Sequence, residues 1–161
     1  MQALAESHRP GQRTVPCADA PSDLWSDWLL HRRHGGDPAY GEAVRRAVER
    51  YADRVLDGAR LRPDMVLADV GAGEGLIAFR AIDRLGPSLR VILTDVSQPM
   101  LRHAEDTASR LSVRSQCRFL RCGAERLEGI EDASVDVVAT RSVLAYVADK
   151  QAALAEFRRV L

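Results

Sequence analysis

The sequence is short of lysine, of aromatic residues and of long apolar runs. Lys150 is the only lysine, aromatic residues make up 5% of the chain, and basic and acidic residues balance at a formal net charge of zero. General binders of nucleic acid or of anionic membranes carry a basic surplus, so neither class is expected. No run of about 18 apolar residues occurs, and the N-terminus lacks the apolar core of a signal peptide. We therefore expect no nucleic-acid partner and no membrane segment.

Cysteine and histidine are scarce as well. Cys17, Cys117 and Cys122 form neither a disulfide framework nor a C-x-x-C metal motif, which favours a reducing cytoplasm. His8 and His103 have no partner at a metal-ligand spacing, so we expect no metal site. A chain of 161 residues with 46% hydrophobic residues is typical of one soluble globular domain.

The N-terminal part predicts a tail and two helices. Residues 1–20 mix Pro, Gly and Arg without periodicity, which indicates a flexible tail. Ser22 is the expected N-cap of a short helix, and a longer amphipathic helix is predicted from Ala39 to Ala59. Three residues share one apolar face of the short helix, which we expect to dock on the domain: Trp25, Trp28 and Leu29.

A glycine loop between a predicted strand and a predicted helix is the most informative local pattern. Val66 to Val70 is an apolar run with one acid, Asp69, as in a strand buried in a parallel sheet. Glycines at alternate positions follow and let a ligand approach the backbone: Gly71, Gly73 and Gly75. A dinucleotide fingerprint would place its third glycine at the position of Leu76. The loop predicts a nucleotide-cofactor site with a spacing that disfavours a dinucleotide.

Strands and helices alternate through the rest of the chain, which predicts an α/β fold. The pattern indicates a doubly wound parallel sheet of four strands with helices on both faces. Beyond the strand at 66–70, strands are predicted at 90–96, 117–122 and 135–140, and helices at 74–86, 97–111 and 150–160.

The same pattern predicts how the chain is divided. Residues 1–20 form the tail, residues 21–60 form helices that cap the site, and residues 61–161 form the domain that holds it. The chain ends soon after the fourth strand. We therefore expect that strand to be an open edge, so that the chain is marginally stable or self-associates through this strand.

Candidate binding residues follow the strands. In parallel sheets, ligands bind beyond the carboxyl ends of the strands. Asp95 ends the second predicted strand, and Gly123, Ala124 and Glu125 follow the third. A carboxylate at Asp95 is able to accept hydrogen bonds from both hydroxyls of a ribose. The alternative is that Asp95 caps the next helix, a task for which Ser97 competes.

Five segments in register resemble the class I S-adenosylmethionine-dependent methyltransferases: VLADVGAGEG, LTDVSQPML, CGAERL, DASVDVVATRSVLAYVADK and EFRRVL. The likeness covers about Tyr51 to Leu161 and is greatest to the small-molecule group that includes enzymes similar to those of quinone biosynthesis. It implies a Rossmann-like fold with S-adenosyl-L-methionine as cofactor. It also implies in-line methyl transfer to a small-molecule acceptor, aided by positioning and by exclusion of water.

The resemblance also implies roles for residues near the methionine and ribose portions of the cofactor. Asp69 would hold the methionine ammonium, and Asp95 would bind the ribose hydroxyls. Arg141 would border the methionine end and the substrate. Three residues would pass their backbone beneath the cofactor: Gly71, Ala72 and Gly73.

On the adenine side this sequence departs from the family. Val96 and Met100 would pack near the ring, although Met100 fits a core position equally well, and Ala124 would offer its backbone amide. Many members carry an acid where this chain has Gly123, and that acid accepts the adenine amino group. Recognition here must depend on the backbone or on Glu125, which is otherwise a solvated loop acid. The lost hydrogen bond would cost about 1 kcal/mol.

No catalytic side chain is assigned from the sequence. If the acceptor is a hydroxyl, four residues are candidates for a general base, each with a structural or solvated alternative: His31, His34, Tyr40 and Tyr146. An NAD-dependent oxidoreductase is an alternative function, against which Leu76 and SVDVVATRSVL count. A cofactor-binding but catalytically incomplete fragment is another, because the chain ends where the family usually continues with a Pro-Gly-Gly turn and further strands.

Overall fold

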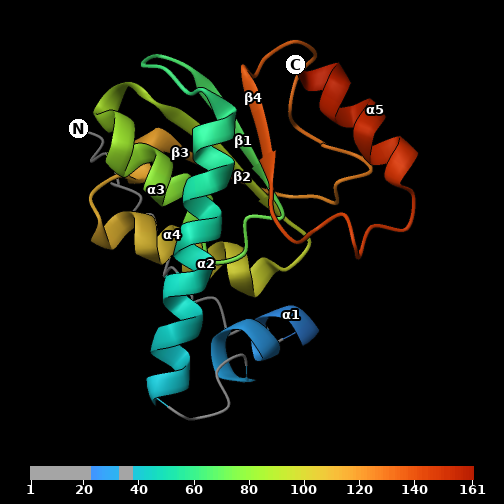
Figure 1. The fold of residues 1–161 in the computed structure, drawn as a ribbon. Coiled ribbons are helices and arrows are strands. Elements are labelled where there is room, and N and C mark those ends of the chain that lie inside the picture. The colour runs from blue at the N-terminus through green and yellow to red at the C-terminus, as the bar shows by residue number, and fades with distance from the viewer. Residues whose placement is uncertain (1–22, 33–37) are drawn as a thin grey trace, which may run out of the picture.

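A parallel sheet of four strands forms the middle layer of the computed structural model, which describes residues 23–32 and 38–161 (Figure 1). The strand order is β3-β2-β1-β4, so the direction of winding reverses between β1 and β4. The strands are β1 (Val66–Val70), β2 (Arg90–Asp95), β3 (Cys117–Arg121) and β4 (Val137–Thr140). This is the predicted doubly wound sheet, and its reversal places a ligand site beside the end of β1.

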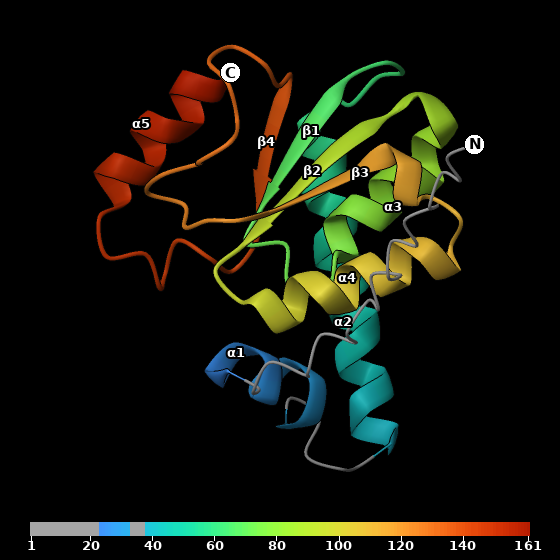
Figure 2. The same ribbon diagram turned by 180° about the vertical axis from the view of Figure 1, so that it is seen from behind.

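Helices cover both faces of the sheet, as predicted (Figures 1 and 2). Three pack on one face: α2 (Pro38–Ala59), α3 (Leu76–Leu85) and α4 (Gln98–Arg110). The helix α5 (Lys150–Val160) and the segment 123–135 cover the other face. At the N-terminal end, α1 (Leu24–Asp27) continues as a π-helical turn, Trp28–Arg32, and two 3₁₀ turns lie at Gly86–Ser88 and Arg114–Gln116.

Alternation along the strands explains the two cores. Leu67, Val91 and Leu93 point toward α2, α3 and α4, and all three are buried. Ala68 and Ile92, one residue away, point toward α5 and the segment before it. Because both faces of every central strand are covered, the strands consist of nearly continuous apolar runs, and β1 and β2 stand out in the sequence for that reason.

Helix caps follow local side-chain chemistry, with one correction to the prediction. Ser97 caps α4, as predicted, by accepting a hydrogen bond from the Met100 amide at 3.2 Å. The N-cap of α1 is Asp23, so the expectation for Ser22, which lies outside the described residues, was wrong. Asp23 accepts from the Ser26 amide at 2.9 Å, and Ser26 Oγ accepts from the Asp23 amide at 3.0 Å. This reciprocal capping box favours Asp23 over its neighbour.

The strand boundaries differ from the prediction at their ends. β2 and β3 each end one residue early, and β4 begins at Val137 rather than Val135. The amide of Val135 donates to the carbonyl of Val160 at 3.0 Å, so this residue is tied to the end of α5 instead of the sheet. In the described part of the chain β4 pairs only with β1, which agrees with an edge position. Self-association through that edge stays a prediction.

The N-terminal helix lies beyond the carboxyl ends of the strands, where the strand arrows point in both views (Figures 1 and 2). The tail predicted for residues 1–20 lies outside the described residues. Within residues 23–32 and 38–161, no helix has both the length and the apolar character needed to span a bilayer. The carboxyl ends of the strands form the edge of a parallel sheet at which ligands bind in such folds.

Candidate functional site

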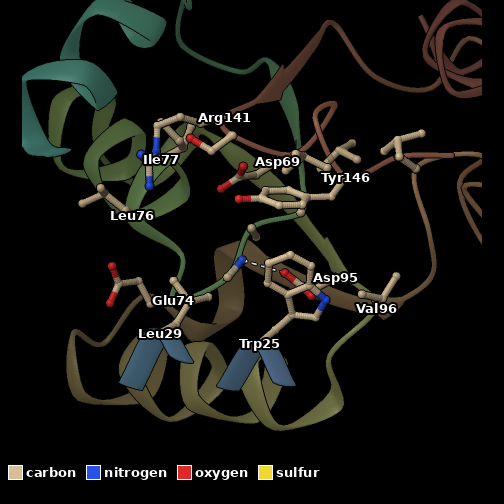
Figure 3. A pocket seen from close by; sticks show the side chains of 18 of the residues that line it. Trp25, Leu29, Asp69, Glu74, Leu76, Ile77, Asp95, Val96, Arg141 and Tyr146 are labelled. Atoms are coloured by element: carbon tan, nitrogen blue, oxygen red, sulfur yellow. Dashed lines mark hydrogen bonds between the residues drawn. The ribbon is translucent and has the colours of Figure 1, made fainter. Parts of the chain in front are cut away.

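A cavity of about 440 Å³ opens at the carboxyl ends of the strands (Figure 3). Small-molecule sites in proteins occupy about 300–1,000 Å³, so the volume suits a cofactor-sized ligand. Its walls come from α1 and the turn after it, from the glycine loop, from the ends of β1 and β2, and from the segments that follow β3 and β4. The cavity lies where the winding of the sheet reverses, as the fold predicts.

The backbone of the glycine loop passes so close to neighbouring side chains that two of its glycines have no room for a Cβ atom. Gly71 has a φ of 68°, and a Cβ added there would lie 2.3 Å from Cγ2 of Val143. Gly75 begins α3 with a φ of 83°, and a Cβ added there would lie 2.4 Å from Cε2 of Phe79. Between them the Ala72 amide donates to the Thr94 carbonyl at 2.8 Å, which fixes the loop to β2.

Asp95 joins the end of β2 to this loop. Its Oδ2 accepts from the Gly73 amide at 2.8 Å, and its Oδ1 accepts from the Ser97 amide at 2.9 Å. Burial raises the pKa of Asp95, while these two backbone hydrogen bonds oppose the rise and the negative charge of Asp23 adds to it. Each carboxylate oxygen has a second lone pair. Asp95 therefore retains acceptor capacity toward the cavity that it lines.

Asp69 is a buried acid at the end of β1. It is 2% exposed, and its Oδ2 accepts from the Ala78 amide in the first turn of α3 at 3.1 Å. Burial raises the pKa of Asp69 to about 7, although the Ala78 hydrogen bond and the positive charge of Arg141 act in the opposite direction. A cationic group that enters the cavity would favour the carboxylate form. The site thus contains a buried acid that a cationic ligand would stabilise in its charged form.

The segment after β3 supplies a further carboxylate at the cavity wall, that of Glu125. Glu125 Oε1 accepts from the Ala148 amide at 3.2 Å, so its side chain bridges the segments that follow β3 and β4. Its Oε2 lies 3.1 Å from the position that a Cβ on Gly123 would occupy. The Glu125 carboxylate therefore reaches the space beside Gly123. Ala124 and Val96 also line the cavity, and Val96 lies near Gly123. Ala124 is buried and Val96 is exposed.

Aromatic and aliphatic side chains form the remaining walls. Trp25 and Leu29 enter from the N-terminal helix, and Arg141 and Tyr146 enter from the opposite side, after β4 (Figure 3). The rings of Trp25 and Tyr146 meet edge to face, with their centroids 4.8 Å apart and an interplanar angle of 74°. This contact joins two segments that are far apart in the sequence.

The structure brings together every predicted cofactor residue except Met100. Nine of the predicted residues line the cavity: Asp69, Gly71, Ala72, Gly73, Asp95, Val96, Ala124, Glu125 and Arg141. Met100 does not: it is fully enclosed in the first turn of α4, where its amide donates to Ser97. Of the two interpretations given for Met100, the structure therefore supports the core position, because the residue is fully buried and does not line the cavity.

Of the predicted general-base candidates, the structure likewise places some at the cavity and others away from it. Tyr146 lines the cavity, whereas His31 and Tyr40 do not, and His34 lies outside the described residues. Sequence reasoning missed several lining residues: Glu74 lies within the glycine loop, Cys122 ends one predicted strand, and Val143 lies three residues after another. Their location near the predicted strand ends and in the glycine loop was the signal in the sequence by which they could have been identified. Across the described residues, no three His, Cys, Asp or Glu side chains gather as a metal site requires.

Comparisons with known proteins give one family. A family model described as a methyltransferase domain matches residues 67–161. Nocamycin O-methyltransferase of Saccharothrix syringae is 33% identical over 110 residues, which cover 68% of this chain and 39% of that protein. The ubiquinone/menaquinone biosynthesis C-methyltransferase UbiE of Xanthomonas oryzae is 34% identical over 118 residues, covering 73% and 45%.

Further similarities are consistent with these. The tRNA 5-carboxymethoxyuridine methyltransferase of Escherichia coli is 32% identical over 110 residues, covering 68% of this chain and 40% of that protein. The solved structure of geranyl diphosphate methyltransferase in complex with SAM matches with a TM-score of 0.69 at 23% identity, covering 79% of this chain and 52% of that chain, and it shows a shared fold. This chain spans less than half the length of the three relatives named.

The glycine loop yields a first prediction. Replacing Gly71 by Ala should lower the free energy of unfolding by about 1 kcal/mol or more, because φ is positive and the new Cβ would collide with Val143. Gly58→Ala is the matched control, since nothing lies within 4 Å of a Cβ added in that turn of α2. It should be neutral or stabilising by about 0.5–1 kcal/mol. Urea unfolding measures both, and equal changes in the two variants would contradict the steric account.

Asp69 yields a second prediction, on pH dependence. Its pKa is about 7 in the folded protein, against an ordinary value of about 3.9 in an unfolded chain. Between these pH values the folded state binds more protons, so this group makes the free energy of unfolding fall as the pH rises from about 4 to about 7. Asp69→Asn should remove this contribution to the pH dependence. The free energy of unfolding of the variant should therefore rise relative to that of the wild type as the pH increases from about 4 to about 7.

Urea unfolding at about pH 5 and about pH 7 measures the effect. Asp83→Asn, at an exposed position of α3, is the control for loss of one carboxyl group. The same pH dependence in wild type and in Asp69→Asn would show that Asp69 is not the group responsible.

Proposed function

The chain belongs to the class I S-adenosylmethionine-dependent methyltransferase family, and on that premise we propose that it transfers a methyl group from S-adenosyl-L-methionine to a small-molecule acceptor. The observation that carries the proposal is the convergence of Asp69, Asp95 and the glycine loop on one cavity. These groups come from the ends of β1 and β2, so the fold itself brings them together.

The chemistry of the cavity fits the methionine and ribose portions of this cofactor. We propose that Asp69 holds the ammonium group, whose positive charge would stabilise the buried carboxylate. The backbone from Gly71 to Gly73 leaves space for close approach of the cofactor, and Asp95 accepts from the ribose hydroxyls with its remaining lone pairs. Arg141 lines the same cavity and would border the methionine end. The cofactor supplies an activated methyl group on a sulfonium centre.

On the adenine side we propose that Glu125 takes the part of the acid missing at Gly123. The support is geometric, because Glu125 Oε2 lies beside Gly123 and the side chain is held by the Ala148 amide. The carboxylate would accept from the adenine amino group, while Ala124 offers its backbone amide and Val96 packs near the ring. This arrangement would compensate for the residue by which the sequence departs from its family.

The proposed methyl transfer requires few catalytic side chains. The cofactor would supply a methyl group on a positively charged sulfur, and the residues that line the cavity would hold that group in line with the acceptor atom. Holding the reactants in line and excluding water supply much of the acceleration in such displacements. Tyr146 lines the cavity and is the predicted general-base candidate that the geometry retains among those described. It would act only if the acceptor is a hydroxyl.

A small molecule is the proposed acceptor because the chain has no basic surplus. The relatives include enzymes that methylate oxygen, carbon and a tRNA nucleoside, according to their names, so the acceptor atom is left open. The alternative of an NAD-dependent oxidoreductase gains nothing from the comparisons, and Leu76 lines the cavity where a dinucleotide fingerprint has glycine.

Calorimetric titration tests the cofactor. S-adenosylhomocysteine should give a saturable heat of binding, NAD should give none, and Asp95→Ala should weaken S-adenosylhomocysteine binding by about 1–3 kcal/mol through loss of charge-assisted hydrogen bonds. Asp106→Ala, at an exposed position of α4, should leave the affinity unchanged. Binding of NAD without binding of S-adenosylhomocysteine would refute the proposed function. Unchanged affinity in a folded Asp95→Ala protein would remove Asp95 from the site.

A second titration tests Glu125. Glu125→Ala should weaken S-adenosylhomocysteine binding about fivefold, equivalent to about 1 kcal/mol for one hydrogen bond. It should have little effect on S-inosylhomocysteine, in which an oxygen replaces the adenine amino group. Glu128→Ala, exposed in the same segment, is the control. If Glu125→Ala weakened both ligands equally, Glu125 would be a structural residue and not the partner of the amino group.

A further inference from the structure

One part of the cavity wall has no role in the proposed cofactor site, and it is aromatic. Trp25 and Trp28 line the cavity from the N-terminal helix and the turn after it, and Tyr146 lines it from the segment after β4. These include both tryptophans of the whole chain. Trp28 is 48% exposed and Tyr146 is 67% exposed, so large ring surfaces remain uncovered. Several exposed rings gathered at one cavity are typical of a binding surface.

The geometry of these rings suits a flat ligand. Trp25 and Tyr146 meet edge to face, at an interplanar angle of 74°, so the face of one ring is left uncovered by the pair. In Figure 3 the Tyr146 ring extends across the cavity with its hydroxyl end directed inward, and Trp25 rises toward it from the helix. Aromatic rings attract other rings in offset or edge-to-face arrangements, with a preference beyond the area that they bury.

The charge of the cavity wall disfavours acceptors that carry a phosphate. Four carboxyl groups line it, from Asp69, Glu74, Asp95 and Glu125. Against these, Arg141 is the one basic side chain among the lining residues that the structure describes. Such a wall suits a cofactor with sulfonium and ammonium charges. It opposes entry of a phosphate, because like charges in a partly desolvated cavity repel and the phosphate would lose its hydration.

From these observations we propose that the acceptor is an uncharged planar ring compound, bound against Trp25, Trp28 and Tyr146 beside the cofactor. The inference rests on the proposed function and names the acceptor class for the same site. Phosphate-bearing acceptors are disfavoured, because the lining carboxyl groups outnumber the one basic side chain among the lining residues that the structure describes. Saturated compounds of the same size are disfavoured because they have no π face to offer the rings.

The test uses three probes with the same fused bicyclic carbon skeleton, measured by calorimetry on protein saturated with S-adenosylhomocysteine. 2-Naphthol carries a planar ring without charge, 2-naphthyl phosphate adds charge to the same ring, and decahydro-2-naphthol removes the π system. We expect 2-naphthol to bind about fivefold more tightly than its saturated analogue. The phosphate ester should bind at least about tenfold more weakly than 2-naphthol.

Variants assign the preference to the rings. Trp25→Leu and Tyr146→Leu should each reduce the fivefold preference for the planar probe while S-adenosylhomocysteine still binds. Tyr51→Leu, at an exposed position of α2 that does not line the cavity, should leave the preference unchanged. The two ring variants lie on separate segments, so one serves if the other fails to fold.

The outcomes separate this inference from the proposed function. If S-adenosylhomocysteine binds and 2-naphthol does not, or if the phosphate ester binds more tightly, the acceptor class is overturned and the proposed function stands. A preference that survives in both ring variants also overturns it. If S-adenosylhomocysteine itself fails to bind, the proposed function fails and the inference fails with it.

Discussion

The hydrogen bond from the Gly73 amide to the Asp95 carboxylate holds the candidate site together. It joins the loop after β1 to the end of β2, and the neighbouring bond from the Ala72 amide to the Thr94 carbonyl runs between the same two segments. Without these contacts the glycine loop would lack a fixed distance from the second strand. The order of the sheet makes them possible, because β1 and β2 are parallel neighbours whose carboxyl ends meet at one edge.

That arrangement places acids where folding alone would not favour them. Asp69 and Asp95 are nearly enclosed, and burial raises the pKa of both. A buried carboxyl group without a full set of partners costs free energy, which backbone amides from Ala78, Gly73 and Ser97 only partly offset. A bound cation and a pair of hydroxyl donors would complete these partners. The disfavoured positions are thus the ones that a charged nucleoside ligand would stabilise, as expected where function overrides stability.

The features that sequence reasoning predicted correctly are mostly local. β1, the start of β2, the Ser97 cap and the bounds of α5 follow from apolar runs and from capping chemistry within a few residues. The errors arise where distant segments compete. Val135 was assigned to a strand but is held by the end of α5, and Met100 was given two alternatives that only its packing separates. The contact between Trp25 and Tyr146 could not be foreseen, because no periodicity relates these residues.

The same contrast separates the cofactor side of the cavity from the acceptor side. The cofactor residues follow strands in a fixed order, so similarity to a family carries them over one by one, and the structure brings nearly all of them to one wall. The aromatic wall is assembled from α1 and from the segment after β4, which meet only through the tertiary fold. The proposal that Trp25, Trp28 and Tyr146 bind the acceptor therefore rests on the tertiary structure of this chain and not on a family motif.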